Sequence, residues 1–132
     1  MDDLTMIIGI GIDIADQVRI REGINDFKDR FTQRLFTAEE IISCQKYRDP
    51  TEHYAGKFAV KEALMKAIGA GLKQHVTFQE IEVLNHDSGA PYITLYGTAK
   101  QIAEQLGVTQ THVSLSHSVG IAAAVVILER LS

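Results

Sequence analysis

The segment MIIGIGIDI, residues 6–14, constrains this chain more than any other stretch because it is short, apolar and rich in β-branched side chains. This composition is typical of a buried β-strand. Successive side chains of a strand point to opposite faces. One face should carry Ile8, Ile10, Ile12 and Ile14. The other should carry Gly9, Gly11 and Asp13, so the glycines leave room beside the aspartate.

Asp13 is the only charged residue of this segment. A carboxylate in such an apolar environment requires a cation or several hydrogen-bond donors. Asp13 is therefore a candidate ligand-binding residue. The alternative is that Asp13 caps the helix that follows the strand, and one side chain can serve both purposes.

Helix and strand signals follow one another along the rest of the chain. Helices are predicted over residues 20–34, from a capping box at residues 37–40 toward Lys46, from residues 49–52 to Gly69 or Gly71, and from Thr98 to Gly107. Strands are predicted over residues 80–85, 91–96, 111–118 and 121–129. The predicted order is strand, three helices, two strands, helix and two strands. This order defines an α+β fold with an antiparallel-rich sheet.

Length and composition favour one ordinary globular domain over residues 1–132, with 45% apolar and 23% charged residues. No stretch approaches the roughly 20 apolar residues that a membrane helix needs, and the opening MDDLT is acidic where a secretory signal is basic. We therefore expect a cytoplasmic protein without a membrane partner. The net charge of −4 disfavours nucleic acid as a partner. The single cysteine, Cys44, excludes an internal disulfide and is assigned no role.

Positive charge gathers in one segment of this acidic chain. Residues 19–34 contain five cations and three acids, a local balance of +2 against −6 elsewhere. The cations are Arg19, Arg21, Lys28, Arg30 and Arg34. An acidic partner could dock on this segment, and the alternative is a solvated helix face of mixed charge.

The predicted helix over residues 55–68, AGKFAVKEALMKAI, is apolar on every side, which is typical of a helix buried in a core. Its charged residues are therefore notable. Glu62 and Lys66 are one turn apart on one face, and Lys57 and Lys61 share an adjoining stripe. The alternative for Glu62 and Lys66 is an ordinary helical pair worth roughly 0.2–0.5 kcal/mol.

Two isolated carboxylates with lysines nearby suit a hard, oxygen-seeking cation and a phosphate-rich ligand. Mg²⁺ fits Asp13 and Glu62 because two carboxylates leave coordination positions for water and phosphate oxygens. Zinc would more often recruit histidine or cysteine. Ser116 and His117, just before a predicted turn, could also meet a ligand, and the alternative for His117 is a hydrogen-bonded structural histidine.

Three segments in this order resemble the holo-acyl-carrier-protein synthase family of 4′-phosphopantetheinyl transferases. The segment GIGIDIADQVRI resembles the family's opening strand motif, KFAVKEALMKAIGAG its F-x-x-K-E-A-x-x-K-A helix, and HVSLSHSVGIAAAVVI its closing S-H-S hairpin. RLFTAEE matches a further family segment, so the resemblance spans Met6 to Glu129. It implies the 4′-phosphopantetheinyl transferase fold and transfer of phosphopantetheine from coenzyme A to a serine of an apo acyl carrier protein. It also implies a homotrimer with sites between protomers.

The resemblance implies roles for individual residues. Asp13 and Glu62 become Mg²⁺ ligands and, with Lys66, the catalytic residues. Residues that bind coenzyme A would be Lys57, Lys61, Lys66, Ser116 and His117. An acidic helix of the carrier would meet Arg19, Arg21 and Arg34. The carrier could belong to fatty-acid, polyketide or another synthesis, and the serine proton could pass to Asp13, Glu62 or a metal-bound water.

Two rival functions use the same residues. A metal-dependent phosphohydrolase or nuclease would also need carboxylates and a lysine around Mg²⁺. A restriction-type nuclease core would place Glu-x-Lys on a strand, whereas Glu62 and Lys66 are four residues apart on a predicted helix. The second rival is a non-enzymatic binding or oligomerisation domain whose carboxylates only cap helices or pair with lysines.

Overall fold

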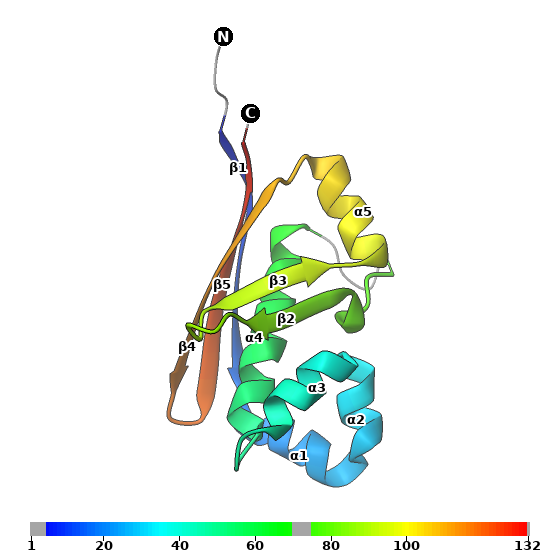
Figure 1. Ribbon diagram of the computed structural model, residues 1–132, viewed down its shortest axis with the longest axis vertical. Helices are drawn as coiled ribbons and strands as arrows, with labels where there is room; N and C mark the ends of the chain where they lie inside the picture. Colours follow the sequence, from blue (N-terminus) through cyan, green and yellow to red (C-terminus); the bar gives the residue numbers. More distant parts are fainter. Residues whose placement is uncertain (1–4, 70–74, 132) are drawn as a thin grey trace.

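The computed structural model describes residues 5–69 and 75–131 (Figure 1). Its helices are α1 (Gln17–Phe27), α2 (Asp29–Leu35), α3 (Ala38–Gln45), α4 (Thr51–Ala67) and α5 (Gly97–Leu106), with a 3₁₀ turn at Phe78–Glu80. Its strands are β1 (Met6–Asp16), β2 (Ile81–Asn85), β3 (Pro91–Leu95), β4 (Gln110–Ser118) and β5 (Ile121–Arg130). The predicted α+β class and the antiparallel strand pairing are confirmed.

Two predicted helix boundaries are wrong. The helix predicted over residues 20–34 is two helices, because Lys28 adopts φ 51° and its N–H closes α1 on the carbonyl of Ile24. The cap predicted at Thr98 is wrong, since Thr98 lies inside α5 and its N–H donates to Glu80 Oε2. The end predicted for α4 near Gly69 is confirmed, since the helix ends at Ala67 with its C-cap at Ile68, and the alternative end at Gly71 lies outside the described residues.

Helix α4 is the central element of the fold. It lies against the three-stranded antiparallel sheet of order β1-β5-β4, and the β2–β3 hairpin packs on another of its sides (Figure 1). Most of its side chains are buried, as the all-round apolar pattern predicts. Within residues 5–69 and 75–131, no helix is long and apolar enough to cross a bilayer.

Strand β1 touches α4 backbone to backbone. A Cβ atom added to Gly11 would lie 1.8 Å from the carbonyl oxygen of Ala63, and one added to Gly9 would lie 1.9 Å from that of Ala67. No larger residue permits this approach without moving the strand. The space beside the glycines, predicted to be open, is therefore filled by the α4 backbone. Asp13 follows on the same side of β1.

The other face of β1 is exposed, so the prediction of a buried strand is wrong for that face. Ile10, Ile12 and Ile14 are each more than 60% exposed. The predicted alternation also fails at Ile8, because the pairing register with β5 shifts between Ile7 and Gly9 and Ile8 packs against the core. Strand β1 therefore presents an apolar strip on the side of the sheet opposite α4.

Candidate active site

Asp13 on β1 and Lys66 on α4 form an ion pair at the contact between the two elements. Lys66 Nζ lies 3.2 Å from Asp13 Oδ1 and donates to the carbonyl oxygen of Ile12 at 3.0 Å. The side chain of Asp13 is 16% exposed, whereas that of Lys66 is 55% exposed. The alternative role of Asp13 as a helix cap is wrong, because Asp16 accepts the N–H of Val18 at the start of α1.

Glu62 lies half-buried one turn before Lys66 on α4. Burial raises the pKa of Glu62, the negative charge of Asp13 raises it further, and Lys66 opposes the shift. The structure thus brings Asp13, Glu62 and Lys66 into one electrostatic cluster. One ammonium faces two carboxylates, so the cluster keeps an excess negative charge.

This cluster fits a divalent cation. Its donors are hard carboxylate oxygens, and a cation would relieve the repulsion that raises the pKa of Glu62. Among the described residues, no group of three or more histidine, cysteine, aspartate or glutamate side chains is placed to hold a metal. A cation held by Asp13 and Glu62 would therefore complete its shell with water or ligand oxygens, as Mg²⁺ commonly does.

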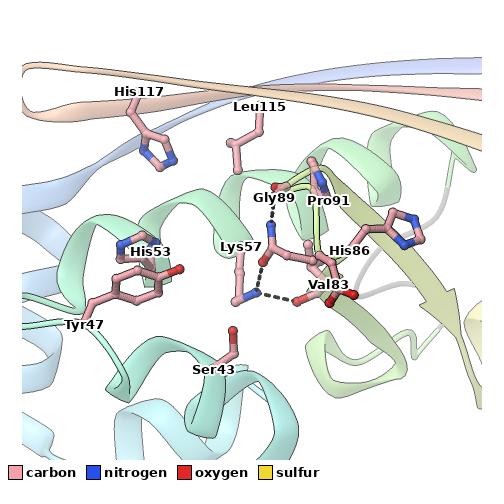
Figure 2. Close-up of a pocket in the computed structure, with 12 residues that line it drawn as sticks. Ser43, Tyr47, His53, Lys57, Val83, His86, Gly89, Pro91, Leu115 and His117 are labelled. Carbon is pink, nitrogen blue, oxygen red and sulfur yellow. Dashed lines mark hydrogen bonds between the residues drawn. The ribbon is translucent and has the colours of Figure 1, made fainter.

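A pocket of about 390 Å³ opens beside α4 between strand β4 and the turn that joins β2 to β3 (Figure 2). Its lining includes His53 and Lys57 of α4, Asn85 of β2, and Leu115 and His117 of β4. Lys57 Nζ donates to the carbonyl oxygen of Val83 at 2.7 Å and to Asn85 Oδ1 at 3.3 Å. Two of the residues predicted to bind coenzyme A, Lys57 and His117, thus share one pocket.

His117 reaches this pocket because Gly56 of α4 leaves space for its ring. A Cβ atom added to Gly56 would lie 2.9 Å from His117 Cε1. His117 Nδ1 is 3.6 Å from Glu52 Oε1, and its ring centroid is 6.5 Å from that of His53. The side chain of His117 is 27% exposed and lines the pocket, so a ligand in the pocket can reach its ring.

His53 and Tyr47 are pocket residues that sequence reasoning missed. Their rings stack with centroids 3.5 Å apart at 15° (Figure 2). Burial lowers the pKa of His53, and the charges of His117 and Lys57 lower it further, whereas Glu52 opposes the shift. His53 precedes Lys57 by four residues on α4, so helical spacing could have placed the two on one face.

Ser116 does not line this pocket. Side chains alternate along β4, so Leu115 and His117 point toward α4 and Ser116 points away. Ser116 pairs with Ala123 of β5, which pairs in turn with Ile14 of β1. Ser116 therefore lies on the same exposed sheet face as the isoleucine strip.

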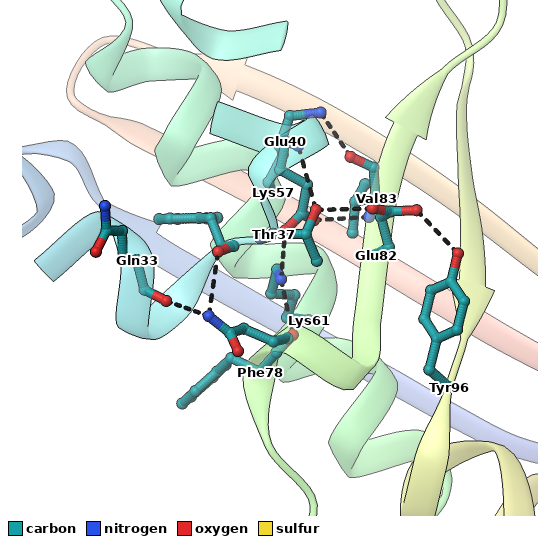
Figure 3. Close-up of polar contacts among 11 residues, drawn as sticks. Gln33, Thr37, Glu40, Lys57, Lys61, Phe78, Glu82, Val83 and Tyr96 are labelled. Atoms are coloured by element: carbon teal, nitrogen blue, oxygen red, sulfur yellow. Dashed lines mark hydrogen bonds and ion pairs between the residues drawn. The ribbon is translucent and has the colours of Figure 1, made fainter. Parts of the chain in front are cut away.

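Lys61 is also away from the pocket. Its side chain is fully buried and its Nζ lies 2.7 Å from Oε1 of the fully buried Glu40 (Figure 3). The same Nζ donates to the carbonyl oxygen of Phe78 at 2.7 Å. Burial lowers the pKa of Lys61, and Glu40 opposes the shift. In this structure Lys61 exposes no surface to a phosphate.

The arginines predicted to bind the carrier occupy different settings. Arg21 forms an exposed ion pair with Asp49 at 3.0 Å. Arg19 lies exposed on α1 beside a hollow that also includes Asp16. Arg34 borders an apolar hollow of about 650 Å³, whose other lining residues are Phe27, Arg30, Phe31, Leu35 and Phe78. Arginines and exposed aromatic surface therefore meet on α1 and α2.

Comparison with known proteins connects this geometry to a family. The sequence profile of the 4′-phosphopantetheinyl transferase superfamily matches residues 9–125. The holo-[acyl-carrier-protein] synthase of Koribacter versatilis is 44% identical over 94% of this chain and 99% of its own length. That of Nitratidesulfovibrio vulgaris strain DP4 is 46% identical with the same coverage of both chains.

Solved structures agree with the sequence relatives. The holo-[acyl-carrier-protein] synthase of Neisseria meningitidis superposes with a TM-score of 0.85 at 30% identity, covering 93% of this chain and 98% of that one. The Helicobacter pylori synthase, solved in complex with coenzyme A, gives 0.78 at 34% identity and covers 93% and 99%. The chain therefore belongs to the 4′-phosphopantetheinyl transferase superfamily. Its resemblance to the holo-acyl-carrier-protein synthase family within that superfamily is confirmed.

Proposed function

We propose that the chain transfers the 4′-phosphopantetheine group of coenzyme A to a serine hydroxyl of an apo acyl carrier protein. The serine oxygen forms a bond to the phosphorus attached to pantetheine, and the pyrophosphate bond breaks to release adenosine 3′,5′-bisphosphate. The observation that carries this proposal is the cluster of Asp13, Glu62 and Lys66 in a chain whose full-length relatives are holo-[acyl-carrier-protein] synthases.

Mg²⁺ is the proposed cofactor, with Asp13 and Glu62 as its protein ligands. When bound, it supplies positive charge that neutralises the pyrophosphate oxygens. Lys66 supplies further charge, because its exposed ammonium can turn from Asp13 toward a phosphate oxygen. The serine proton can pass to a carboxylate oxygen of Asp13 or Glu62, or to a water molecule beside them.

The pocket beside α4 is the proposed site for the phosphate-bearing part of coenzyme A. Lys57 uses two of its three N–H donors on Val83 and Asn85, which leaves one for a ligand oxygen. His117 lies on the opposite wall (Figure 2). The Helicobacter pylori relative was solved in complex with coenzyme A, which supports coenzyme A as the ligand.

The hollow bordered by Arg30 and Arg34 is the proposed docking surface for the carrier. Phe27 beside it is 53% exposed, and the Arg30 guanidinium lies 5.8 Å from the centre of the Phe27 ring. An acidic helix with apolar side chains would match both the positive charge and the apolar floor. Arg19 extends the positive surface along α1, whereas Arg21 would first have to leave Asp49.

A homotrimer with sites shared between protomers is the proposed assembly. The apolar strip of Ile10, Ile12 and Ile14 is too exposed for an isolated protomer, and a second copy would cover it. Ser116 lies on the same sheet face, so it could contribute to the site of a neighbouring protomer. Ile12→Glu should place a charge in this interface and dissociate the assembly, which sedimentation velocity would detect as a fall in mass.

Carrier modification is the direct test of the proposed reaction. The protein is incubated with coenzyme A, Mg²⁺ and candidate apo carriers, and each carrier is weighed by mass spectrometry while adenosine 3′,5′-bisphosphate is quantified. Transfer predicts a carrier heavier by one phosphopantetheine group and an equal amount of nucleotide. Nucleotide release without a heavier carrier would instead identify a phosphohydrolase, and no release with any carrier would favour a binding domain.

A further inference from the structure

A buried polar network joins α4 to α3, β2 and the 3₁₀ turn at Phe78–Glu80 (Figure 3). Lys61 and Glu40 form its centre, both side chains being fully buried and 2.7 Å apart. Glu40 Oε1 also accepts the N–H of Thr37 at 2.8 Å, and Glu40 Oε2 accepts the N–H of Val83 at 2.7 Å. Lys61 donates in addition to the carbonyl oxygen of Phe78. One ion pair therefore connects α3, α4, β2 and the 3₁₀ turn before β2.

Lys57 adds a second attachment one turn earlier on α4. Its ammonium donates to the carbonyl oxygen of Val83, whose N–H is already bound by Glu40. Val83 is therefore tied to α4 at two places. Its N–H donates to Glu40, which pairs with Lys61, and its carbonyl oxygen accepts from Lys57. Two attachments separated along a helix restrict both its rotation about its axis and its sliding along β2.

The residue after Lys61 is Glu62, which belongs to the metal-binding cluster. Adjacent helical side chains are about 100° apart around the axis, so a rotation of α4 moves Lys61 and Glu62 together. The Gly11 contact with Ala63 brings β1 close on the other side, and Asp13 stands on that strand. The distance between the two carboxylates therefore depends on how α4 is oriented between β2 and β1.

We propose that Lys61 is a positioning residue, whose buried ion pair with Glu40 orients α4 so that Glu62 stands beside Asp13. This inference rests on the proposed function and gives Lys61 a role without contact to coenzyme A. A buried ion pair is not required for stability as such, since apolar residues of similar volume often serve as well. Orientation of the helix is the property that the directional bonds of Lys61 and Glu40 supply.

The test compares variants that remove these bonds in different ways. Lys61→Met keeps the aliphatic volume but leaves the Glu40 carboxylate buried without its cation. Glu40→Gln combined with Lys61→Met removes both charges. Glu40→Asp keeps the charge and withdraws the carboxylate by one methylene. Lys100→Met on the exposed face of α5 is the matched control, because it removes a lysine that lies outside the network.

Each variant is studied at a temperature where circular dichroism and urea titration show it to be fully folded. Calorimetry gives the Mg²⁺ dissociation constant without coenzyme A, and steady-state kinetics give kcat and the KM for coenzyme A. Misplaced metal ligands should weaken Mg²⁺ binding about tenfold in the folded charge-removing variants, with an intermediate effect in Glu40→Asp. The kcat should fall by roughly 10²-fold, with KM for coenzyme A changed less than about twofold.

The outcomes separate positioning from stability. If the folded variants bind Mg²⁺ and turn over like the parent and the Lys100→Met control, the pair contributes only to stability and the proposal is wrong. Should Lys61→Met not fold, the double variant and Glu40→Asp give the same readouts. The metal titration requires no carrier, so a parent that binds Mg²⁺ but transfers nothing would reject the proposed function while leaving this test intact.

Discussion

Replacing Gly11 with alanine should separate β1 from α4, the two elements that carry the proposed metal ligands Asp13 and Glu62. The added Cβ atom would meet the Ala63 carbonyl oxygen at 1.8 Å, whereas real Cβ atoms essentially never approach closer than 3.0 Å. The obstacle is helix backbone, which cannot turn aside as a side chain can. Strand β1 must therefore move from α4 by at least about 1 Å, the difference between these distances.

Both stability and catalysis should respond to this movement. Overpacking of this kind costs about 1–3 kcal/mol, and the rigid backbone contact places Gly11→Ala at the upper end. Asp13 lies two residues further along the displaced strand, so its separation from Glu62 changes as well. A displacement of about 1 Å in a catalytic arrangement can lower the rate roughly 10²-fold.

Urea titration and carrier modification measure the two effects. Gly69→Ala is the control, because Gly69 has φ 67° and an added Cβ would meet no atom of residues 5–69 and 75–131 within 4 Å. That control should lose about 1–2 kcal/mol through backbone strain alone and keep the Mg²⁺ affinity of the parent. Parental stability and rate in Gly11→Ala would refute the close packing of β1 on α4.

Three further predictions concern charge. The pKa of Glu62 is raised above its usual 4.5, so the ionised carboxylate weakens the fold as pH rises through this raised pKa. Glu62→Gln should therefore raise the urea midpoint at neutral pH without Mg²⁺ and lose this advantage in acid or with Mg²⁺. A lower midpoint of the variant without metal would contradict the shift. Because the pKa of His53 is lowered below its usual 6.5, the unfolded chain takes up the proton first and stability falls as pH drops through 6.5. His53→Phe, which can still stack on Tyr47, should flatten the pH dependence of the melting temperature, and an unchanged slope would argue against it. Arg19→Glu combined with Arg34→Glu should raise the KM for the carrier but not for coenzyme A, and should reduce the salt dependence of the carrier kinetics. Parental carrier kinetics in the folded double variant would exclude this surface as the docking site.

The cluster of Asp13, Glu62 and Lys66, which we propose as the catalytic site, was predictable because its residues are unusual in their surroundings. Asp13 interrupts an apolar strand and Glu62 lies in a helix that is apolar all round, so both attract attention without knowledge of the fold. The structure then brings them together with Lys66 through the contact of β1 with α4. The order of the elements was also predictable from local cap and turn signals, except that the break at Lys28 divides one predicted helix into α1 and α2.

The different positions of Lys57 and Lys61 in the fold were not predictable from the sequence. Lys57 and Lys61 share a helical stripe, but only the fold shows that one reaches the pocket wall and the other a buried glutamate. Glu40 is 21 residues from Lys61 in the chain, and no periodic pattern connects them. Strand alternation likewise separates two faces of β1 without showing that one meets α4 and the other lies exposed.

Metal titration of a double-mutant cycle tests the shared site of Asp13 and Glu62 most directly. Calorimetry gives the Mg²⁺ affinity of the parent, Asp13→Asn, Glu62→Gln and the double variant, each shown to be folded by circular dichroism. If both carboxylates hold one ion, each single substitution should remove most of the binding and the double variant should lose little more. Parental affinity in either folded single variant, or losses that simply add, would contradict a single site formed by β1 and α4.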